Sequence, residues 1–373
     1  MLNLLVTEDF KVPAFQNWIE DLSQNAMVLT EDEFYENKQK TYLIITSKVR
    51  SHLLDKADNF FLCRKDDVYL EIPSVFRLVF RIVRQGLTFM HYSRKEVSEE
   101  LCYLELCRKC LVREAQPSRN ALVHSTFGEK VSFDISKHFP LITTKRVFFR
   151  GVVEELLFFL RGQTNSKILS DKGVSIWSAN TSSEILKKLG LNYQEGEMGP
   201  MYGAQWRNFN SQNIDQLDRV VSMLRSDPFT RRAVFTSFNP AEVDKGCLYP
   251  CHTLIGHFSV RGNSLDYLVY NRSCDLACGF PFNLASSALL LIIVAKLVSK
   301  EPGTLTMMMG DVHVYDSHTD LLWRQVLRPC YNFPKLSISK SLQNLKDVEE
   351  LCYEDFTLSD YNCHRKLEYK MIP

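Results

Sequence analysis

The sequence has almost no net charge with which to attract a charged polymer or surface. Its 373 residues include 45 lysines and arginines against 44 aspartates and glutamates, a formal net charge of +1. A protein that binds nucleic acid or an anionic membrane over a broad face normally carries a clear positive excess. The composition therefore predicts neither partner, and any bound anion must be held by a local cluster of basic residues.

The sequence also lacks the signals of an exported or membrane protein. The opening MLNLLVTEDFKVPAF has no basic segment followed by an apolar run and a small-residue cleavage site. The longest apolar stretch, from Phe280, is interrupted by Pro281, Asn283 and Lys296, which favours a buried helix starting near Asn283 over a membrane span. We expect a cytoplasmic protein, with nuclear presence also open.

Neither a disulfide framework nor a metal centre is well supported, although the chain has 11 cysteines. Their number is odd and their spacing irregular, which argues against complete pairing in a reducing compartment. Cys107 and Cys110 form the only close pair, and no second pair or His-x-His arrangement completes four ligands. The sequence predicts reduced thiols and no metal.

Residues 1–97 differ in pattern from the rest of the chain. Short apolar runs such as YLIITSKV and VYLEI alternate there with charged stretches such as LTEDEFYENKQK. We predict an N-terminal extension or degenerate extra domain over residues 1–97 and a main domain over residues 98–373.

The main domain is predicted to be α+β. Apolar residues at helical spacing predict helices near 98–112 and 150–162. Alternating apolar stretches predict strands near 231–239, 252–260, 264–271 and 304–315. We expect a large mixed sheet covered by helices, with polar residues at the strand ends as site candidates.

Cys251, in the stretch LYPCHTLIG, stands beside His252 at the mouth of a predicted strand. An unperturbed thiol has a pKa of about 8.5, so a good nucleophile needs positive charge nearby. Arg231, Arg232 and Arg272 are the candidates. Arg231 and Arg232 open a strand and point to opposite faces, which fits two roles or a subunit contact. Cys251 alone is more often a buried thiol without a task.

The stretch YNRSCDLACGFPFN collects polar groups ahead of the buried helix. Arg272 offers a fork for phosphate, Ser273 a hydroxyl, and Asn283 an amide at the predicted helix N-terminus. Asp275 lies between them. This combination favours an anion-binding site over a merely solvated strand end.

Two further groups are ambiguous by themselves. Asp311, His313 and Tyr315 in GDVHVY share one strand face by the two-residue period, so they either line a pocket or pack singly. Glu154 and Glu155 lie on a mostly apolar helix, and periodicity does not decide which of them is buried for a reason.

From about residue 100 to the C-terminus the sequence resembles the thymidylate synthase family. The resemblance rests on ordered blocks that include GPMYGAQWRNF, DPFTRRAVF, YPCHTL, NRSCD, GFPFNLASSALL and GDVHVY. It implies a homodimeric α+β enzyme with its sheet at the dimer interface. It also implies reductive methylation of dUMP to dTMP, with 5,10-methylenetetrahydrofolate as co-substrate and dihydrofolate as product.

The family mechanism gives Cys251 a covalent role. Its thiolate adds to C6 of the pyrimidine, which makes C5 a carbon nucleophile toward the folate one-carbon unit; C5 then loses its proton, tetrahydrofolate is eliminated and hydride returns. Tyr202 matches the residue implicated in removing that proton, and Glu155, rather than Glu154, matches the carboxylate that organises water. His252 matches a hydrogen-bonding neighbour of the nucleophile.

The resemblance also assigns the remaining candidates. The catalytic set is Cys251, Glu155, Tyr202, Asn271 and Asp275. The dUMP-binding set is Arg119, Arg231, Arg232, Arg272, Ser273, Cys274, Asp275, Asn283, His313 and Tyr315. The folate-binding set is Lys145, Ile176, Trp177, Asn180, Asp275, Gly279 and Phe282. Arg231 and Arg232 would reach across the dimer interface, and the Asn283 amide points to uracil over cytosine.

Four departures from the family pattern fall near the site. The phosphate loop, here PSRNALVHSTFG, lacks both family glycines and places Arg119 one or two residues out of line. Asn271 replaces a longer glutamine, Ser178 replaces an aspartate, and the chain ends on Pro373. These changes keep two alternatives open: a hydroxymethyltransferase acting on deoxyuridylate or, less favoured, deoxycytidylate, and a lapsed nucleotide-binding paralogue. No reductase motif is legible before residue 98.

Overall fold

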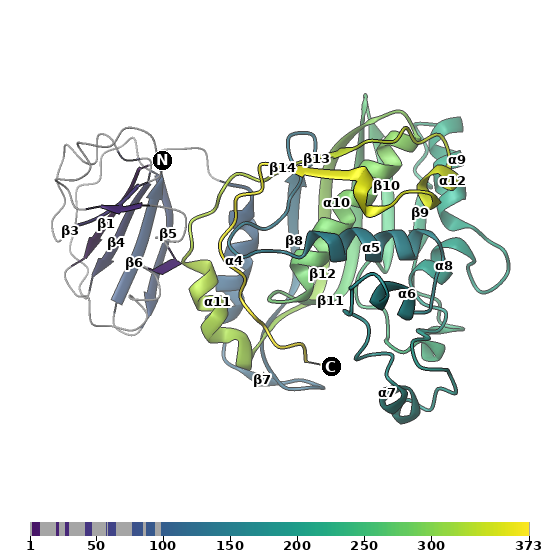
Figure 1. Ribbon diagram of the computed structural model, residues 1–373, viewed down its shortest axis with the longest axis horizontal. Coiled ribbons are helices and arrows are strands. Elements are labelled where there is room, and N and C mark those ends of the chain that lie inside the picture. The colour runs from purple at the N-terminus through teal and green to yellow at the C-terminus, as the bar shows by residue number, and fades with distance from the viewer. Residues whose placement is uncertain are drawn as a thin grey trace.

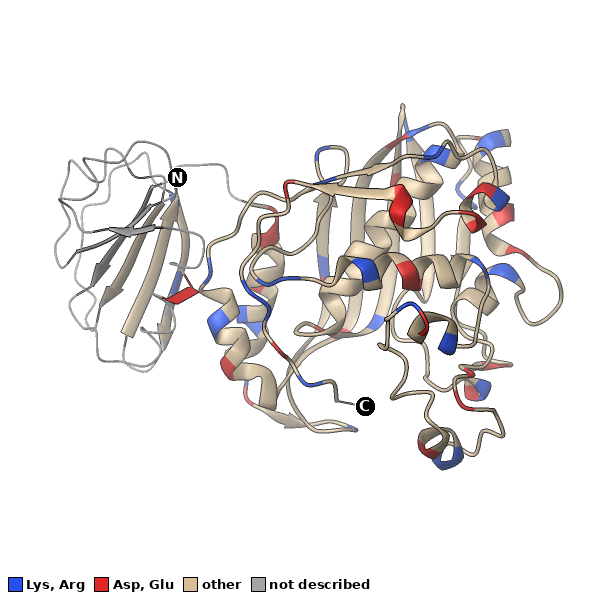
Figure 2. Cartoon of the chain, viewed as in Figure 1, with Lys and Arg blue, Asp and Glu red and all other residues tan. Residues whose placement is uncertain are grey.

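The computed structural model describes residues 2–7, 20–21, 27–29, 42–46, 57, 59–64, 77–84, 87–93 and 98–372. The stretch VYLEI and Pro373, both singled out from the sequence, lie outside the described residues. Two separate six-stranded sheets organise what is described (Figure 1). Basic and acidic residues are interspersed over the chain (Figure 2).

The first sheet belongs to the N-terminal region, and its strand order is β2-β3-β1-β4-β6-β5. Its strands are β1 Leu2–Thr7, β2 Met27–Leu29, β3 Tyr42–Thr46, β4 Asn59–Arg64, β5 Arg77–Arg84 and β6 Leu87–Ser93. β1 is parallel to β3 and β4, whereas β6 is antiparallel to β4 and β5. Phe61, Phe80 and Phe89 belong to the same buried cluster as the main-domain helix residues, so the two parts share a core.

The second sheet carries the candidate site, and its strand order is β7-β8-β12-β11-β10-β9. Its strands are β7 Gln116–Pro117, β8 Leu122–Asp134, β9 Val234–Thr236, β10 Ile255–Arg261, β11 Ser264–Asp275 and β12 Glu301–Tyr315. Only β11 and β12 pair in parallel, so the sheet is mixed as predicted. The strand expected to open at Arg231 is shorter: Arg231 and Arg232 lie in the segment before β9.

Helices cover one face of this sheet. The helices that pack on it or around it are α4 Glu100–Leu111, α5 Phe149–Leu160, α6 Lys167–Ser170, α7 Ser183–Lys188, α8 Gly203–Arg207, α9 Gln216–Ser226, α10 Gly279–Leu297, α11 Thr319–Val326 and α12 Leu345–Glu349. Beside them, β13 Lys335–Ile338 pairs with β14 Phe356–Ser359. The predicted α+β fold, a mixed sheet covered by helices, is confirmed.

The central helix α10 is apolar on every side and packs against β11 and β12 (Figure 1). It begins at Gly279, with Cys278 as N-cap, and not near Asn283 as the sequence indicated. Pro281 is tolerated because the first helical turn needs no backbone donor there. Among the described residues it is the one helix long and apolar enough to span a membrane, but 78% of its apolar window is buried inside the protein.

The other face of the second sheet has no helix over it in the described part of the chain. Ile255, Tyr270 and Met308 stand side by side in one row across β10, β11 and β12. Ile255 is 44% and Met308 43% exposed, whereas the alternate residues Phe258 and Met307 are fully buried. The sheet therefore presents a partly apolar, uncovered face.

Helices α5 and α8 pack so closely at Gly203 that there is no room for one additional methyl group. A Cβ added at Gly203 would lie 2.4 Å from the Phe159 carbonyl oxygen and 2.6 Å from Phe159 Cα. We predict that Gly203→Ala lowers the free energy of unfolding by about 1–3 kcal/mol, because rigid backbone must move. Urea denaturation measures the change.

Gly279→Ala is the matched control, since nothing lies within 3.7 Å of a Cβ added at Gly279. Equal stability losses at Gly203 and Gly279 would contradict this packing.

Candidate active site

Cys251 lies in the loop before β10, and two neighbouring elements fix the backbone of this loop. The Cys251 amide donates to the Tyr202 hydroxyl oxygen at 3.1 Å, and Ser273 N donates to the Cys251 carbonyl at 3.3 Å. Arg272 donates to the carbonyls of Pro250 and Tyr249, each at 2.9 Å. The position of the thiol is thus set by residues at the N-terminus of α8 and in β11.

Two residues of this site adopt backbone conformations that side chains disfavour. Tyr202 has φ of 45° and Thr253 has φ of 50°. The Thr253 amide donates to Asn271 Oδ1 at 2.8 Å, which holds the strained loop onto β11. The Asn271 Nδ2 is buried without a hydrogen-bond partner in the described structure. We read Asn271 as a brace for the Cys251 loop.

The Cys251 thiol is close to Tyr202 but short of positive charge. The Tyr202 hydroxyl lies 3.5 Å from Sγ. Burial raises the pKa of Cys251 above its ordinary value, and the Tyr202 hydrogen bond and Arg272 lower it only in part. Arg231 and Arg232 are exposed and do not act on this thiol within the chain. Of the three predicted activating arginines, one chain brings only Arg272 to Cys251.

His252 is a packing residue. It is buried, and its ring stacks on Tyr202 with centroids 4.4 Å apart. Desolvation lowers the pKa of His252 to about 4, so the ring is neutral at pH 7. It shares a hydrogen bond with Thr253 Oγ1 at 3.1 Å. The resemblance makes His252 a hydrogen-bonding neighbour of Cys251; in the structure its described side-chain hydrogen bond goes to Thr253 and its ring packs on Tyr202.

The two adjacent glutamates of α5 have separate environments. Glu154 forms an ion pair with Lys172 at 2.6 Å. Glu155 accepts a hydrogen bond from Trp177 Nε1 at 2.8 Å and has no cationic partner among the causes of its shift. Desolvation raises the pKa of Glu155 to about 7, and Trp177 in turn packs against Tyr202 with ring centroids 5.9 Å apart. Glu155 is therefore the carboxyl suited to proton transfer near neutral pH, as expected.

Asp311, His313 and Tyr315 lie on β12, and their side chains contact one another as neighbours on one strand face do. His313 Nδ1 lies 2.6 Å from Asp311 Oδ1, and the His313 and Tyr315 rings are 5.2 Å apart. Strand pairing sets Asp275 of β11 opposite His313 and Ser273 opposite Asp311. The polar groups of two distant stretches thus meet at one end of the sheet.

The altered phosphate loop is a hairpin. Residues 118–121 turn between β7 and β8, with Ser118 N donating to the Ala121 carbonyl at 3.0 Å. Burial raises the pKa of Tyr315, and the nearby Asn120 side chain and Arg119 lower it only in part. The hairpin therefore brings Arg119 to the end of β12 without the family glycines. Asn120 was missed from the sequence, where it reads as an ordinary turn residue.

The residues expected to bind folate have the following contacts. Asp275 Oδ1 accepts from the amides of Ala277 and Cys278 at the start of α10. Lys145 donates to the Ala277 carbonyl, and Ile176 and Phe282 are only partly buried although they pack on the core.

Three other residues predicted to lie in the site differ in their exposure to solvent. Asn180 is partly exposed, and so is Gly279. The Cys274 side chain is fully buried, so Cys274 presents only its backbone to the site.

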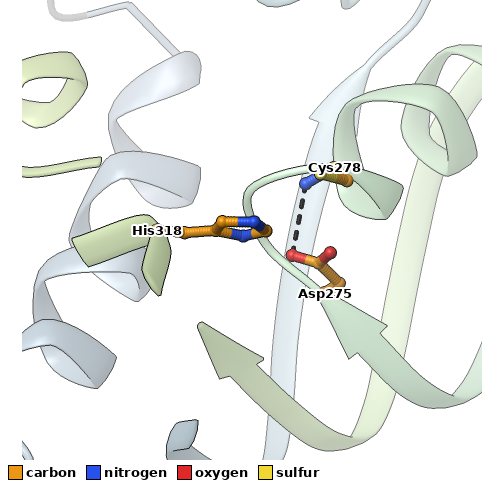
Figure 3. A group of neighbouring side chains, drawn as sticks. All are labelled: Asp275, Cys278 and His318. Atoms are coloured by element: carbon orange, nitrogen blue, oxygen red, sulfur yellow. Dashed lines mark hydrogen bonds between the residues drawn. The ribbon is translucent and has the colours of Figure 1, made fainter. Parts of the chain in front are cut away.

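Asp275, Cys278 and His318 form the one group in the described structure whose ligand atoms are close enough to hold a metal ion, all within 4.8 Å (Figure 3). His318 Nδ1 is buried without a hydrogen-bond partner there. However, one Asp275 oxygen already accepts hydrogen bonds from the Ala277 and Cys278 amides, and the Lys145 ammonium interacts with both Asp275 and Cys278. That positive charge opposes a divalent cation. We therefore assign no metal ion to this group. That the protein binds no metal remains a prediction from the sequence.

The fold and the side chains gathered around Cys251 define an α+β protein with a candidate cysteine nucleophile. The family model for thymidylate synthase matches residues 101–373. Thymidylate synthase of Saccharomyces cerevisiae is 40% identical over 73% of this chain and 97% of its own length. Thymidylate synthase 1/2 of Encephalitozoon cuniculi is 41% identical over 66% of this chain and 87% of its own. The chain belongs to the thymidylate synthase family.

A bifunctional dihydrofolate reductase-thymidylate synthase of Paramecium tetraurelia is 36% identical to this chain, over 91% of this chain and 80% of its own length. The family match from residue 101 covers less than three quarters of the chain. The similarity to the Paramecium protein therefore extends well into the N-terminal region.

The raised pKa of Glu155 predicts a pH-dependent stability. The folded protein keeps the Glu155 proton up to about pH 7, whereas an unfolded glutamate releases it near 4.3, so this stabilising contribution is present at low pH and is lost as pH rises to 7. Glu155→Gln carries no such loss. We predict that the variant gains about 2–3 kcal/mol in free energy of unfolding relative to wild type between pH 5 and pH 8.

Urea titrations at both pH values measure this gain. Glu154→Gln is the control, because it breaks the ion pair with Lys172 and is expected to destabilise at pH 8. A Glu155→Gln variant with the same pH dependence as wild type would refute the assignment.

Proposed function

We propose that this chain is a methyltransferase that converts dUMP to dTMP with 5,10-methylenetetrahydrofolate and releases dihydrofolate. The observation that supports the proposal most directly is the position of the Cys251 thiol. It lies beside Tyr202 and next to β11, and the strand paired with β11, β12, carries His313 and Tyr315. Family membership and relatives named thymidylate synthase support this function over hydroxymethylation.

The nucleotide is proposed to lie between the ends of β11 and β12. Arg119, Arg272 and Ser273 would hold its phosphate, while His313 and Tyr315 face the sugar. The Asn283 side chain makes no hydrogen bond within the described residues, so its donor and acceptor are free to read the uracil edge. Asn283 is the fifth residue of α10 and is partly exposed, whereas Phe280 and Pro281 before it are buried.

The half-buried Ile176 and Phe282 would contact an aromatic ring system, and Asp275 would meet its hydrogen-bonding groups. Trp177, Asn180, Lys145 and Gly279 complete the proposed set. When bound there, the folate supplies the one-carbon unit and the hydride.

The protein's own groups divide the chemistry. Cys251 Sγ supplies the electron pair that forms a bond to C6 of the pyrimidine. Burial raises the pKa of Tyr202 well above its ordinary value, so Tyr202 keeps its proton and donates to the thiolate. Glu155, with a pKa of about 7, is the group that can take or return a proton at neutral pH.

A homodimer built on the uncovered sheet face supports this chemistry. The row of Ile255, Tyr270 and Met308 is suited to burial against a second copy. Arg231 and Arg232, which are exposed and do not reach Cys251 of their own chain, are proposed to enter the partner's site as phosphate ligands.

The division of labour along the chain is also a proposal. Residues 98–373 would form the catalytic domain and residues 1–97 a diminished extra domain. The similarity to the Paramecium protein supports a common origin of this region with part of a bifunctional protein, and we propose no reductase activity for it. A cytoplasmic location, with nuclear presence open, completes the proposal.

One incubation tests the proposed function. Purified protein with dUMP and methylenetetrahydrofolate is predicted to form dihydrofolate, followed by absorbance, and a methylated nucleotide, identified by mass. Cys251→Ala is predicted to lose at least about 10³-fold in turnover, since no other group can form the bond to C6, while nucleotide binding by calorimetry persists.

Cys352→Ala is the control, because Cys352 is an exposed cysteine that belongs to none of the proposed sets, and it should leave turnover unchanged. A hydroxymethylated product without dihydrofolate would favour the hydroxymethyltransferase. Tight dUMP binding without any turnover would favour a lapsed enzyme.

A further inference from the structure

The N-terminal region reaches the catalytic domain through a buried carboxylate. Asp21 is fully buried, and two arginines at and just beyond the end of α11 converge on it. Arg324 donates to both oxygens of Asp21, at 2.6 and 2.8 Å, and Arg328 donates to Oδ1 at 2.7 Å. A short acidic segment lies against the basic residues of α11 (Figure 2). These three residues form the Asp21 clasp.

Arg328 connects the clasp to the root of the C-terminal tail, residues 364–372. It is 1% exposed, and the nitrogen that does not face Asp21 donates to the carbonyls of Thr144, at 2.7 Å, and of Arg365, at 3.0 Å. The tail amide of His364 donates to the Thr143 carbonyl at 2.8 Å. Burial lowers the pKa of His364 to about 4, so this ring adds no charge at neutral pH.

The tail then runs along α11 to the proposed folate side of the site. Tyr369 donates to Gln325 Oε1 at 2.9 Å, and the Lys370 carbonyl lies 2.8 Å from His318 Nε2. The Lys145 ammonium lies 4.6 Å from the centre of the Tyr369 ring. The two arginines of the clasp thus connect directly to the tail. Arg324 precedes Gln325, which binds Tyr369, and Arg328 donates to the Arg365 carbonyl.

The charge balance explains why Asp21 is needed. Two guanidinium groups meet with one buried carboxylate between them, and the other acidic residue, Glu20, is 58% exposed and only 3.3 Å from Arg324. An ion pair buried to this degree cannot lose its carboxylate without leaving Arg328 an uncompensated cation. Arg328 would then shift, and with it the carbonyls of Thr144 and Arg365.

A second contact couples the same parts. Arg108 of α4 lies 4.7 Å from the centre of the Phe80 ring in β5 and donates to the Val326 carbonyl at the end of α11 at 2.9 Å. The N-terminal sheet therefore also packs against the group that fixes the C-terminal end of α11.

We propose that Asp21 is a positioning residue for the C-terminal tail, so that the N-terminal region sets how well the catalytic domain binds its folate co-substrate. The inference rests on the proposed function for the identity of that co-substrate. The geometric part, that Asp21 orders residues 364–372, stands independently of it.

The test compares Asp21→Asn with Glu20→Gln in the full chain. Asp21→Asn is expected to raise the KM for methylenetetrahydrofolate roughly tenfold or more, with the KM for dUMP changed less than about twofold. Hydrogen exchange of the amides in 364–372 is expected to accelerate in Asp21→Asn only. Glu20→Gln, whose partner bond is long and exposed, should match wild type in both measurements.

A uniform loss of thermal stability without a selective change in the folate KM or in tail exchange would overturn the proposal. If Asp21→Asn does not fold, Arg324→Gln serves instead, since it removes two of the three arginine bonds to the Asp21 carboxylate among the described residues and should shift both readouts in the same direction by about threefold. No shift there would also overturn it. Wild-type protein without turnover would sink the proposed function, whereas the exchange measurement would still decide the clasp.

Discussion

The burial of the Cys251 thiol is the constraint on which the site depends. Desolvation favours the neutral thiol and raises its pKa, yet the proposed chemistry needs a thiolate. Within one chain the opposing influences are the Tyr202 hydroxyl and Arg272, and Arg272 is also committed to the carbonyls of Pro250 and Tyr249. A single chain therefore fixes the position of its nucleophile but supplies little positive charge to stabilise the thiolate.

The arrangement of the second sheet would allow a second copy of the chain to supply the missing positive charge. Helices cover one face of the second sheet, and the other face presents Ile255, Tyr270 and Met308 without a cover in the described structure. Arg231 and Arg232 project from the segment before the edge strand β9 of that sheet. A second copy on this face would bury apolar surface and add cations to each site, so dimerisation and activation would be one event.

Much of the local structure was predictable because it follows from short-range patterns. Helical spacing located α4 and α5, and strand alternation located β10, β11 and β12. The start of α10 was misplaced because Pro281 and Asn283 read as boundary signals, although a proline is harmless in a first turn. β9 was overestimated because arginines beside an apolar run do not reveal where pairing begins.

The contacts that define the site could not be read from the sequence, since they join distant residues. Asn271 braces Thr253, Asn120 meets Tyr315, and Asp21 pairs with Arg328 more than 300 positions away. The choice of Glu155 over Glu154 came from resemblance; the structure supplies its physical basis, a lysine partner for one carboxylate and only an indole donor for the other.

The central claim is that arginines of one protomer complete the Cys251 site of the other, and subunit complementation tests it most directly. Cys251→Ala and the Arg231→Ala, Arg232→Ala double variant, each inactive alone, are unfolded, mixed in equal amounts and refolded, then assayed for dTMP formation. Random pairing makes half of the dimers mixed with one intact site each, so we predict about a quarter of wild-type activity. Cys251→Ala with Arg272→Ala should regain none, because Arg272 acts within its own chain. No recovery in the first mixture, or equal recovery in both, would contradict the account.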